Sequence, residues 1–168
     1  DTSLTLINDQ SWFSTYALSV RKDDSLTEVT TDADDADAIK YSLTTVQIFM
    51  DKSKKEAVVV NGGLIYNAAK GENKTYHRLE LGTKYSRPFR GWDASWTAGF
   101  SVYYANYPDI STERSDTNML LSYALAKPIN KKLSLGLMLD YTNNNSTLSS
   151  SKYSRYSAMA TGTYNFDF

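Results

Sequence analysis

The chain contains 168 residues, 22% of them charged, with a formal net charge of −1 at pH 7 and no cysteine. This length accommodates one domain, and the near-neutral charge does not indicate a nucleic-acid partner. The lack of cysteine excludes disulfides, thiolate metal sites and thiol nucleophiles. Mean hydropathy is −0.46, and no run approaches the ~18 apolar residues of a membrane-spanning helix. Mean hydropathy hardly detects transmembrane strands, however, because the polar residues of such a strand offset its lipid-facing ones.

Apolar residues alternate with small or polar ones along eight segments, which predicts β-strands with one apolar and one polar face. In chain order the segments are Ser11–Lys22, Ile39–Asp51, Glu56–Ala69, Tyr76–Arg87, Asp93–Tyr107, Thr117–Lys127, Leu133–Asn143 and Tyr153–Phe168. The second segment is irregular, because Leu43 has one parity and Val46 and Ile48 have the other. A β-bulge near Thr44-Thr45 would reconcile them and would turn Gln47 toward the polar side.

The connections between these segments alternate in length. Those after the second, fourth and sixth segments are tight, whereas those after the first, fifth and seventh are longer; only the third connection departs from this pattern. Short turns on one rim and long loops on the other are typical of bacterial outer-membrane barrels. We therefore predict an all-β fold: an eight-stranded antiparallel up-and-down transmembrane β-barrel over residues 11–168, with both termini periplasmic. Residues 1–10 are expected to be an N-terminal periplasmic tail or stub, or an extra pairing.

Alternation alone does not say which face points inward. An eight-stranded interior is just wide enough for side chains to fill, and the apolar face carries too many bulky groups for it. The polar face is rich in Ser, Thr, Ala and Gly, which suit a crowded interior, whereas water-facing surfaces favour Lys and Glu. The sequence therefore favours lipid outside and a polar, side-chain-filled lumen.

Aromatic residues are expected at both ends of the strands, as at membrane interfaces. The short-turn rim would hold Trp12, Phe49, Phe89, Trp92, Trp96, Phe166 and Phe168. The opposite rim would hold Tyr41, Tyr66, Tyr76, Tyr104, Tyr107, Tyr141, Tyr153 and Tyr156.

Charged residues on the polar face must be paired or hydrated in a narrow lumen. They are Arg21, Arg78, Glu80, Lys84, Asp140, Arg155 and Asp167. Three carboxylates facing four bases predict an ion-pair network that closes the lumen; a narrow ion pathway gated by the same pairs is the alternative.

Two other features bear on a possible catalytic or metal site. His77 is the single histidine, and the nearest acid at a suitable spacing, Glu80, points to the opposite face, so the sequence predicts no catalytic residue. Asp32, Asp34, Asp35 and Asp37 form a weak candidate for divalent-ion binding in a loop expected to be solvated. No cofactor is expected.

The closing segment carries Tyr164, Phe166 and the terminal Phe168 in alternation. In this it resembles the small eight-stranded outer-membrane barrels of the OmpA transmembrane-domain and OmpX class. The resemblance implies that these three aromatics are an assembly signal read by the barrel-assembly machinery. It also implies contact with lipopolysaccharide and phospholipid in the outer membrane of a Gram-negative bacterium.

We therefore expect a non-enzymatic outer-membrane barrel with a structural or surface-interaction role and a surface or periplasmic protein as a possible partner. Three alternatives remain open. They are a narrow pore or component of an outer-membrane transport or secretion system, a lipid-modifying outer-membrane enzyme, and a soluble lipocalin-like ligand-binding barrel.

Overall fold

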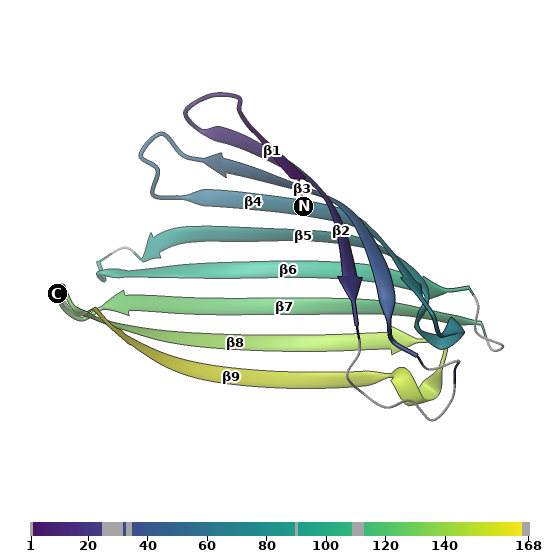
Figure 1. The fold of residues 1–168 in the computed structure, drawn as a ribbon. Coiled ribbons are helices and arrows are strands. Elements are labelled where there is room, and N and C mark those ends of the chain that lie inside the picture. Colours follow the sequence, from purple (N-terminus) through teal and green to yellow (C-terminus); the bar gives the residue numbers. More distant parts are fainter. Residues whose placement is uncertain (1, 25–31, 33–34, 90, 109–112, 166–168) are drawn as a thin grey trace.

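The protein folds into antiparallel strands joined by hairpins, shown in Figure 1. This computed structural model describes residues 2–24, 32, 35–89, 91–108 and 113–165. The strands are β1 (Thr2–Ile7), β2 (Trp12–Asp23), β3 (Ala38–Met50), β4 (Ala57–Ala69), β5 (Tyr76–Phe89), β6 (Ala94–Tyr107), β7 (Arg114–Pro128), β8 (Leu133–Ser146) and β9 (Tyr153–Tyr164). Two 3-10 turns, η2 (Glu72–Lys74) and η3 (Ser149–Ser151), precede β5 and β9.

In the part of the chain that the structure describes, nine strands form one sheet in sequence order, and every neighbouring pair is antiparallel. The up-and-down all-β topology agrees with the sequence prediction, and β2 to β9 correspond to the eight predicted segments. The predicted number of strands was wrong, because residues 2–7 add β1 to the edge of β2. An extra strand pairing was one of the three predictions for residues 1–10, and the pairing of β1 with β2 confirms it. Leu4 and Leu6 alternate with polar residues there, as in the longer strands.

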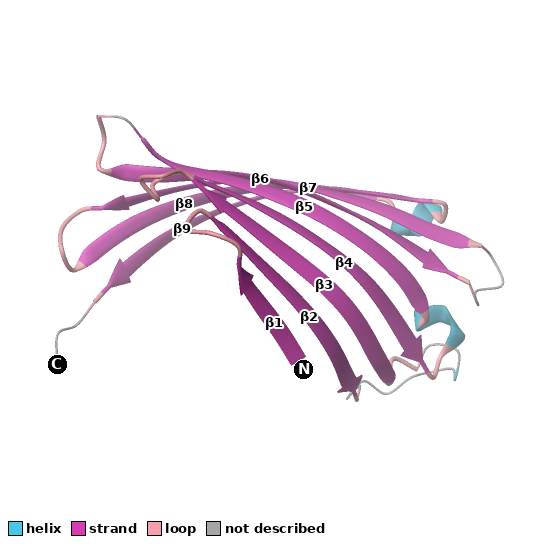
Figure 2. Cartoon of the chain, turned by 90° about the horizontal axis from the view of Figure 1, so that it is seen from above, coloured by secondary structure: helices cyan, strands magenta, loops and turns pink. Residues whose placement is uncertain are grey.

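The sheet is curved, and its two edges stand apart in both views (Figures 1 and 2). Among the described residues, β1 pairs with β2 alone and β9 pairs with β8 alone. The structure therefore shows an open sheet with β1 and β9 at its edges.

Each ladder from β2 to β9 runs without interruption, so the register assigns every strand residue to one of two faces. β3 pairs one-to-one with both neighbours from end to end, and the predicted bulge at Thr44-Thr45 is therefore wrong. Gln47 lies on the same face as Leu43. It is accommodated there because its side-chain oxygen accepts hydrogen bonds from Trp12 Nε1 (3.0 Å) and Ser14 Oγ (2.5 Å).

The two faces differ in chemistry and in burial. We call the face of Leu43, Leu81 and Leu137 the apolar face and the face of Ser101 and Asp140 the polar face. Most of the buried strand residues lie on the polar face: Ala38, Ile65, Ala105, Asp116, Asn118, Asn144 and Ser146. Curvature toward the polar face produces this difference, because side chains converge on the inside of a bend.

The described part of the chain has no hydrophobic core. Its buried apolar residues are Ala38, Ile65, Ala94 and Ala105, whereas 34 large apolar side chains are exposed. Leu18, Leu64 and Leu81 are more than half exposed, at 58%, 57% and 53%. The accessible surface is 11780 Å², against about 8,300 Å² for a compact monomer of 18.9 kDa. The fold has therefore left a complete apolar face without protein to cover it.

Asp51 organises the turn between β3 and β4. Its carboxylate accepts hydrogen bonds from the backbone N–H groups of Ser53, Lys55 and Glu56 and from the Ser53 hydroxyl. These bonds, that from the Glu56 N–H foremost, lower the pKa of Asp51 from 3.8 to about 2. The ionised carboxylate thus fixes a turn in which Lys54 has a positive φ of 56°.

The turn should therefore tighten and loosen with the charge of Asp51. Because the folded pKa is depressed, its contribution is complete above about pH 4 and is lost as pH falls toward about 2. We expect the amide NMR signals of Lys55 and Glu56 to titrate with a midpoint near pH 2. Asp51→Asn should abolish the transition, and a midpoint near 3.8 would contradict this account of the turn.

Glycine allows close approach on the polar face. A Cβ at Gly99 would lie 2.5 Å from Ser122 Oγ and 3.2 Å from Lys84 Cγ, whereas a Cβ at Gly62, on the apolar face, would lie 3.4 Å from Leu81 Cδ2. Gly99 is therefore the more crowded of the two positions.

Adding bulk at these two glycines should have unequal costs. We expect Gly99→Val to lower the free energy of unfolding by about 1–3 kcal/mol through overpacking. Gly62→Val should cost less, because its side chain points outward. Urea titration in detergent micelles, followed by tryptophan fluorescence, measures both; equal losses would refute the difference in crowding.

Candidate functional site

The structure places six of the seven predicted lumen charges on the polar face: Arg21, Arg78, Glu80, Lys84, Asp140 and Arg155. Asp167 lies outside the described residues. Their ion pairs join residues two apart on one strand and do not cross between strands. Arg21 Nε lies 2.6 Å from Asp23 Oδ1, and Arg78 Nη2 lies 2.9 Å from Glu80 Oε2.

The other three charges are arranged differently. The Ser157 hydroxyl donates to Asp140 Oδ2 at 3.3 Å. Lys84 and Arg155 form no ion pair with another residue in the part of the chain that the structure describes. The six described charges therefore share a face without forming one continuous network of ion pairs.

The proposed assembly signal is described only in part. Tyr164 ends β9 opposite Leu133, on the apolar face, while Phe166 and Phe168 lie outside the described residues.

His77 lies on the apolar face at the long-loop end of β5. Its ring stacks on Tyr66 with centroids 4.6 Å apart, and Tyr66 stacks in turn on Tyr41 at 6.2 Å. Glu80 lies on the opposite face, as the parity of β5 predicted. The surroundings of His77 are aromatic and apolar, and no carboxylate orients it among its described contacts.

Two of the four weak metal-candidate aspartates are engaged by a lysine. Lys70 Nζ lies 2.7 Å from Asp37 Oδ2 and 4.0 Å from Asp35 Oδ2. The hydrogen bond from Lys70 to Asp37 is the main cause that raises the pKa of Lys70. Asp32 is exposed, and Asp34 lies outside the described residues. Among the described residues, no group of three or more His, Cys, Asp or Glu side chains could hold a metal ion.

The predicted aromatic belts are only partly on the apolar face. Rings pair there at the short-turn end (Trp12 with Phe49, Tyr85 with Trp96) and at the long-loop end (Tyr141 with Tyr156). Three members of the predicted tyrosine belt, Tyr76, Tyr107 and Tyr153, instead lie on the polar face. Sequence position had indicated the correct rim but not the face on which these rings lie.

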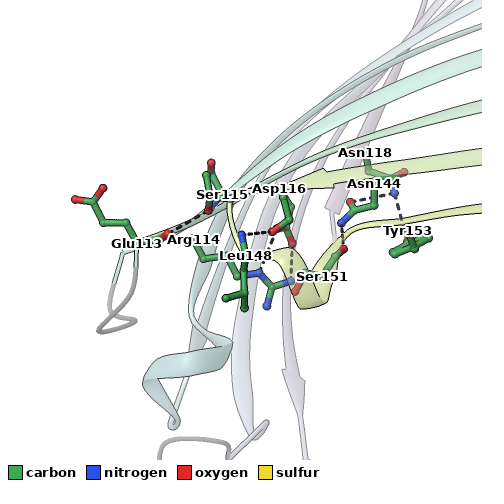
Figure 3. Close-up of polar contacts among 11 residues, drawn as sticks. Glu113, Arg114, Ser115, Asp116, Asn118, Asn144, Leu148, Ser151 and Tyr153 are labelled. Carbon is green, nitrogen blue, oxygen red and sulfur yellow. Dashed lines mark hydrogen bonds and ion pairs between the residues drawn. The ribbon is translucent and has the colours of Figure 1, made fainter.

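These tyrosines belong to a cluster that the sequence analysis missed. We call it the rim cluster; it lies at the long-loop end of the polar face and consists of Tyr76, Arg78, Tyr103, Tyr107, Arg114, Asp116, Asn118, Asn144 and Tyr153. Five strands, β5 to β9, contribute to it. Figure 3 shows the part of the cluster on β7, β8 and β9.

Arg114 and Asp116 form its most buried ion pair. Arg114 Nη2 donates to Asp116 Oδ2 at 2.6 Å and its Nε donates to Oδ1 at 3.2 Å, a two-pronged geometry visible in Figure 3. Asp116 is 3% exposed, and the Arg114 guanidinium lies over the Tyr107 ring at 4.3 Å. The guanidinium of Arg114 is thus held by an acidic partner along its edge and by an aromatic ring at its face.

Two buried amides continue the cluster toward the edge of the sheet. Asn118 Nδ2 donates to Asn144 Oδ1 (3.3 Å) and to the Tyr153 hydroxyl (3.4 Å), which lies two strands away on β9. Asn144 Nδ2 donates to the Ser151 carbonyl at 2.7 Å and thereby fastens η3 to β8 (Figure 3). The amides therefore link three strands and one loop.

Arg78 forms the second cationic centre of the cluster. Its guanidinium lies 5.0 Å from the Tyr103 ring centroid, and its Nε is buried without a hydrogen-bond partner among the described residues. Arg78 thus combines an ion pair to Glu80, a ring contact and an unsatisfied donor.

The rim cluster contains arginine, tyrosine, asparagine and carboxylate groups that mainly satisfy one another. It presents no described hydroxyl or amine next to a histidine base, the arrangement that nucleophilic catalysis needs. Its described contacts join β5 to β9 at this rim and fasten η3 to β8. No described helix is both long and apolar enough to cross a membrane.

Comparison with protein-family models finds no match to this chain, and searches of curated proteins and of solved structures find no significantly similar one.

Removing the buried carboxylate should weaken the rim cluster. Asp116→Ala leaves the Arg114 guanidinium without its anion, so we expect the free energy of unfolding to fall by about 1–3 kcal/mol. Asp140→Ala is the matched control, because Asp140 lies on the same face but is only half-buried, and its carboxylate accepts a hydrogen bond from the exposed Ser157 hydroxyl. It should cost less than about 0.5 kcal/mol. Equal effects in urea titrations would show that the rim cluster adds no stability.

Proposed function

We propose that this sheet is part of the wall of a transmembrane β-barrel in the outer membrane of a Gram-negative bacterium. Its apolar face would contact lipid and its polar face would line the interior. The observation that carries this proposal is the complete apolar face, exposed across all nine strands with no described protein layer over it. In water such a surface is an association site, whereas in a bilayer it is solvated.

Strand length supports the proposal. Strands β2 to β9 contain 12 to 15 residues each. At about 3.3 Å per residue, twelve residues extend about 40 Å, or about 28 Å across a membrane at a tilt of 45°. This matches an apolar band about 25 Å tall. β1, with six residues, is too short to cross alone.

The strand ends also suit two membrane interfaces. The three tryptophans lie at the short-turn end, where Lys127 Nζ sits 4.8 Å from the Trp92 ring centroid. The long-loop end carries Tyr41, Tyr66 and Tyr156 on the apolar face. Amphipathic rings and snorkelling lysines are favoured at headgroup depth, and lipopolysaccharide and phospholipid are the lipids we expect there.

Within the membrane we propose a non-enzymatic, structural or surface-interaction role. Its support is the rim cluster, which fastens η3, in the connection between β8 and β9, through the hydrogen bond from Asn144 to Ser151. A narrow pore is the second candidate, favoured by Lys84 and Arg155 on the polar face. Ionic conductance in planar bilayers would distinguish the two, since a structural wall gives none.

Tryptophan quenching by brominated lipids tests the membrane proposal directly. All three native tryptophans should be quenched more strongly by bromine near the headgroup than by bromine near the acyl-chain end, because they lie at one rim. A chain that stays monomeric and folded in buffer and shows no quenching would be the soluble ligand-binding barrel instead.

Adjacent residues on opposite faces provide the matched pair. With the native tryptophans replaced by phenylalanine, Phe100→Trp places the probe mid-strand on the apolar face and Ser101→Trp on the polar face. Deep bromine should quench the first and leave the second nearly unchanged. The reverse order would place the polar face on lipid and refute the proposed orientation.

A further inference from the structure

The apolar face is hollowed at the long-loop end of β7, β8 and β9. We call this the polar hollow; its volume is about 440 Å³, within the range of about 300–1,000 Å³ typical of small-molecule sites. Four of the side chains that line it have the parity of the apolar face and are nevertheless polar: Thr117, Asn143, Asn145 and Ser154. The apolar face therefore becomes polar at this end of the three strands.

Lys152 supplies the charge of the polar hollow. It is exposed, and its ammonium forms no ion pair in the part of the chain that the structure describes. Among the described residues, no carboxylate lines the hollow. The side chains of Thr117 and Asn145 likewise have no described hydrogen-bond partner. An uncompensated ammonium among amides and hydroxyls suits an anionic ligand that also carries hydroxyl groups.

The walls of the polar hollow are held by hydrogen bonds within the protein. Asn144 Nδ2 donates to the Ser151 carbonyl at 2.7 Å and so holds the residue that precedes Lys152. Asn143 Nδ2 donates to Ser154 Oγ at 2.8 Å, which joins β8 to β9 beside the hollow. A site whose walls are fixed before binding loses less conformational entropy when its ligand arrives.

A second, apolar hollow of about 380 Å³ lies next to the first, toward the middle of the same strands. Leu121 and Tyr141, which pair across β7 and β8, line it, and the next outward-facing pair toward the long loops, Met119 and Asn143, lines the polar hollow. The ring of Tyr156 lies 4.7 Å from that of Tyr141, between centroids. The two hollows thus form one strip that is polar at the rim and apolar below it, as a ligand with a polar head and a hydrocarbon chain requires.

We propose that the two hollows together bind one glycolipid of the outer leaflet, lipopolysaccharide, with phosphorylated sugars in the polar hollow and an acyl chain in the apolar one. This inference rests on the proposed membrane location and adds a defined site to it. Lys152 pairs with a phosphate, while Thr117 and Asn145 exchange hydrogen bonds with sugar hydroxyls. Because neutral polar side chains outnumber the single ammonium, a phosphorylated sugar fits better than a glycerophospholipid headgroup. Tyr141 and Tyr156 lie at headgroup depth, where tyrosine is favoured.

Removing the lysine and removing the phosphate should have the same effect, and the two should not add. The full chain in detergent micelles is titrated with lipopolysaccharide or with dephosphorylated lipopolysaccharide, and native mass spectrometry counts the bound lipid. Lys152→Gln should weaken binding of the phosphorylated form about tenfold, whereas the dephosphorylated form should bind the variant and the wild type alike.

Lys74→Gln is the matched control for charge. Lys74 is an exposed lysine of η2 at the same rim but outside the polar hollow, so its loss should change the affinity less than about twofold. Equal losses in Lys152→Gln and Lys74→Gln would overturn the proposal. So would a dephosphorylation effect of the same size in Lys152→Gln as in the wild type.

Asn145 distinguishes a sugar site from a site for phosphate alone. Asn145→Leu should weaken lipopolysaccharide binding about threefold to tenfold and leave the weaker binding of phosphatidylglycerol unchanged. Asn106→Leu is the control, because Asn106 is exposed with the same parity at the long-loop end of β6, outside the polar hollow. Phosphatidylglycerol that binds as tightly as lipopolysaccharide would show a phospholipid site and overturn the assignment.

The membrane location has a separate readout. Quenching by brominated lipids in vesicles reports insertion, which neither Lys152→Gln nor Asn145→Leu should alter. A chain that inserts but binds both forms of lipopolysaccharide equally overturns the glycolipid site alone. A chain that is not quenched overturns the membrane location, and this inference with it.

Discussion

The structure depends on one constraint: neighbouring strands satisfy each other's backbone hydrogen bonds, but the apolar side chains are not buried within the described part of the protein. The ladders between β1 and β9 pair the strands along their length. The side chains that would form a core in a water-soluble fold instead cover one face, and Ile65 is the largest of the few buried apolar residues among those described. The hydrophobic driving force that normally stabilises a domain of this size must therefore come from contact with something else.

The polar face follows from the same constraint. Curvature brings its side chains together, so small residues such as Gly99 are needed at mid-strand, while larger polar groups gather at the long-loop end. The rim cluster meets the cost of burying polar atoms by pairing them: Arg114 with Asp116, Asn118 with Asn144 and Tyr153. Arg78 Nε is the exception among the described residues. The connection between β8 and β9 is therefore attached to an ordered polar layer.

Much of the sheet could be predicted from the sequence because a period of two is a strong local signal. Strict alternation in residues 133–143 predicted β8 and which of its residues share a face, and the tight connections predicted the hairpins. β1 was left unassigned because it is short, although Leu4 and Leu6 alternate in it. The bulge in β3 was inferred on the assumption that apolar residues share a face. Gln47 breaks that assumption, because Trp12 and Ser14 supply its hydrogen bonds from the neighbouring strand.

The site was harder to predict than the fold, because it depends on which strands curvature brings together. Arg114 and Asp116 lay in a stretch assigned to a connection, so their pairing had no signal in the alternation. Position along the strands predicted the correct rim for Tyr76, Tyr107 and Tyr153. The distance of a residue from a turn does not, however, show whether its side chain lies on the apolar or the polar face. Arg78 and Glu80 were placed on the polar face correctly, since parity within one strand is a local property.

The central claim is that the apolar face contacts acyl chains, and nuclear Overhauser effects between detergent and protein measure that contact directly. In micelles, acyl-chain protons should show strong effects to the methyl groups of Leu43, Leu81 and Leu137. They should show none to Ile65 and Leu120 of the polar face. Detergent contacts concentrated on Ile65 and Leu120 would contradict the account.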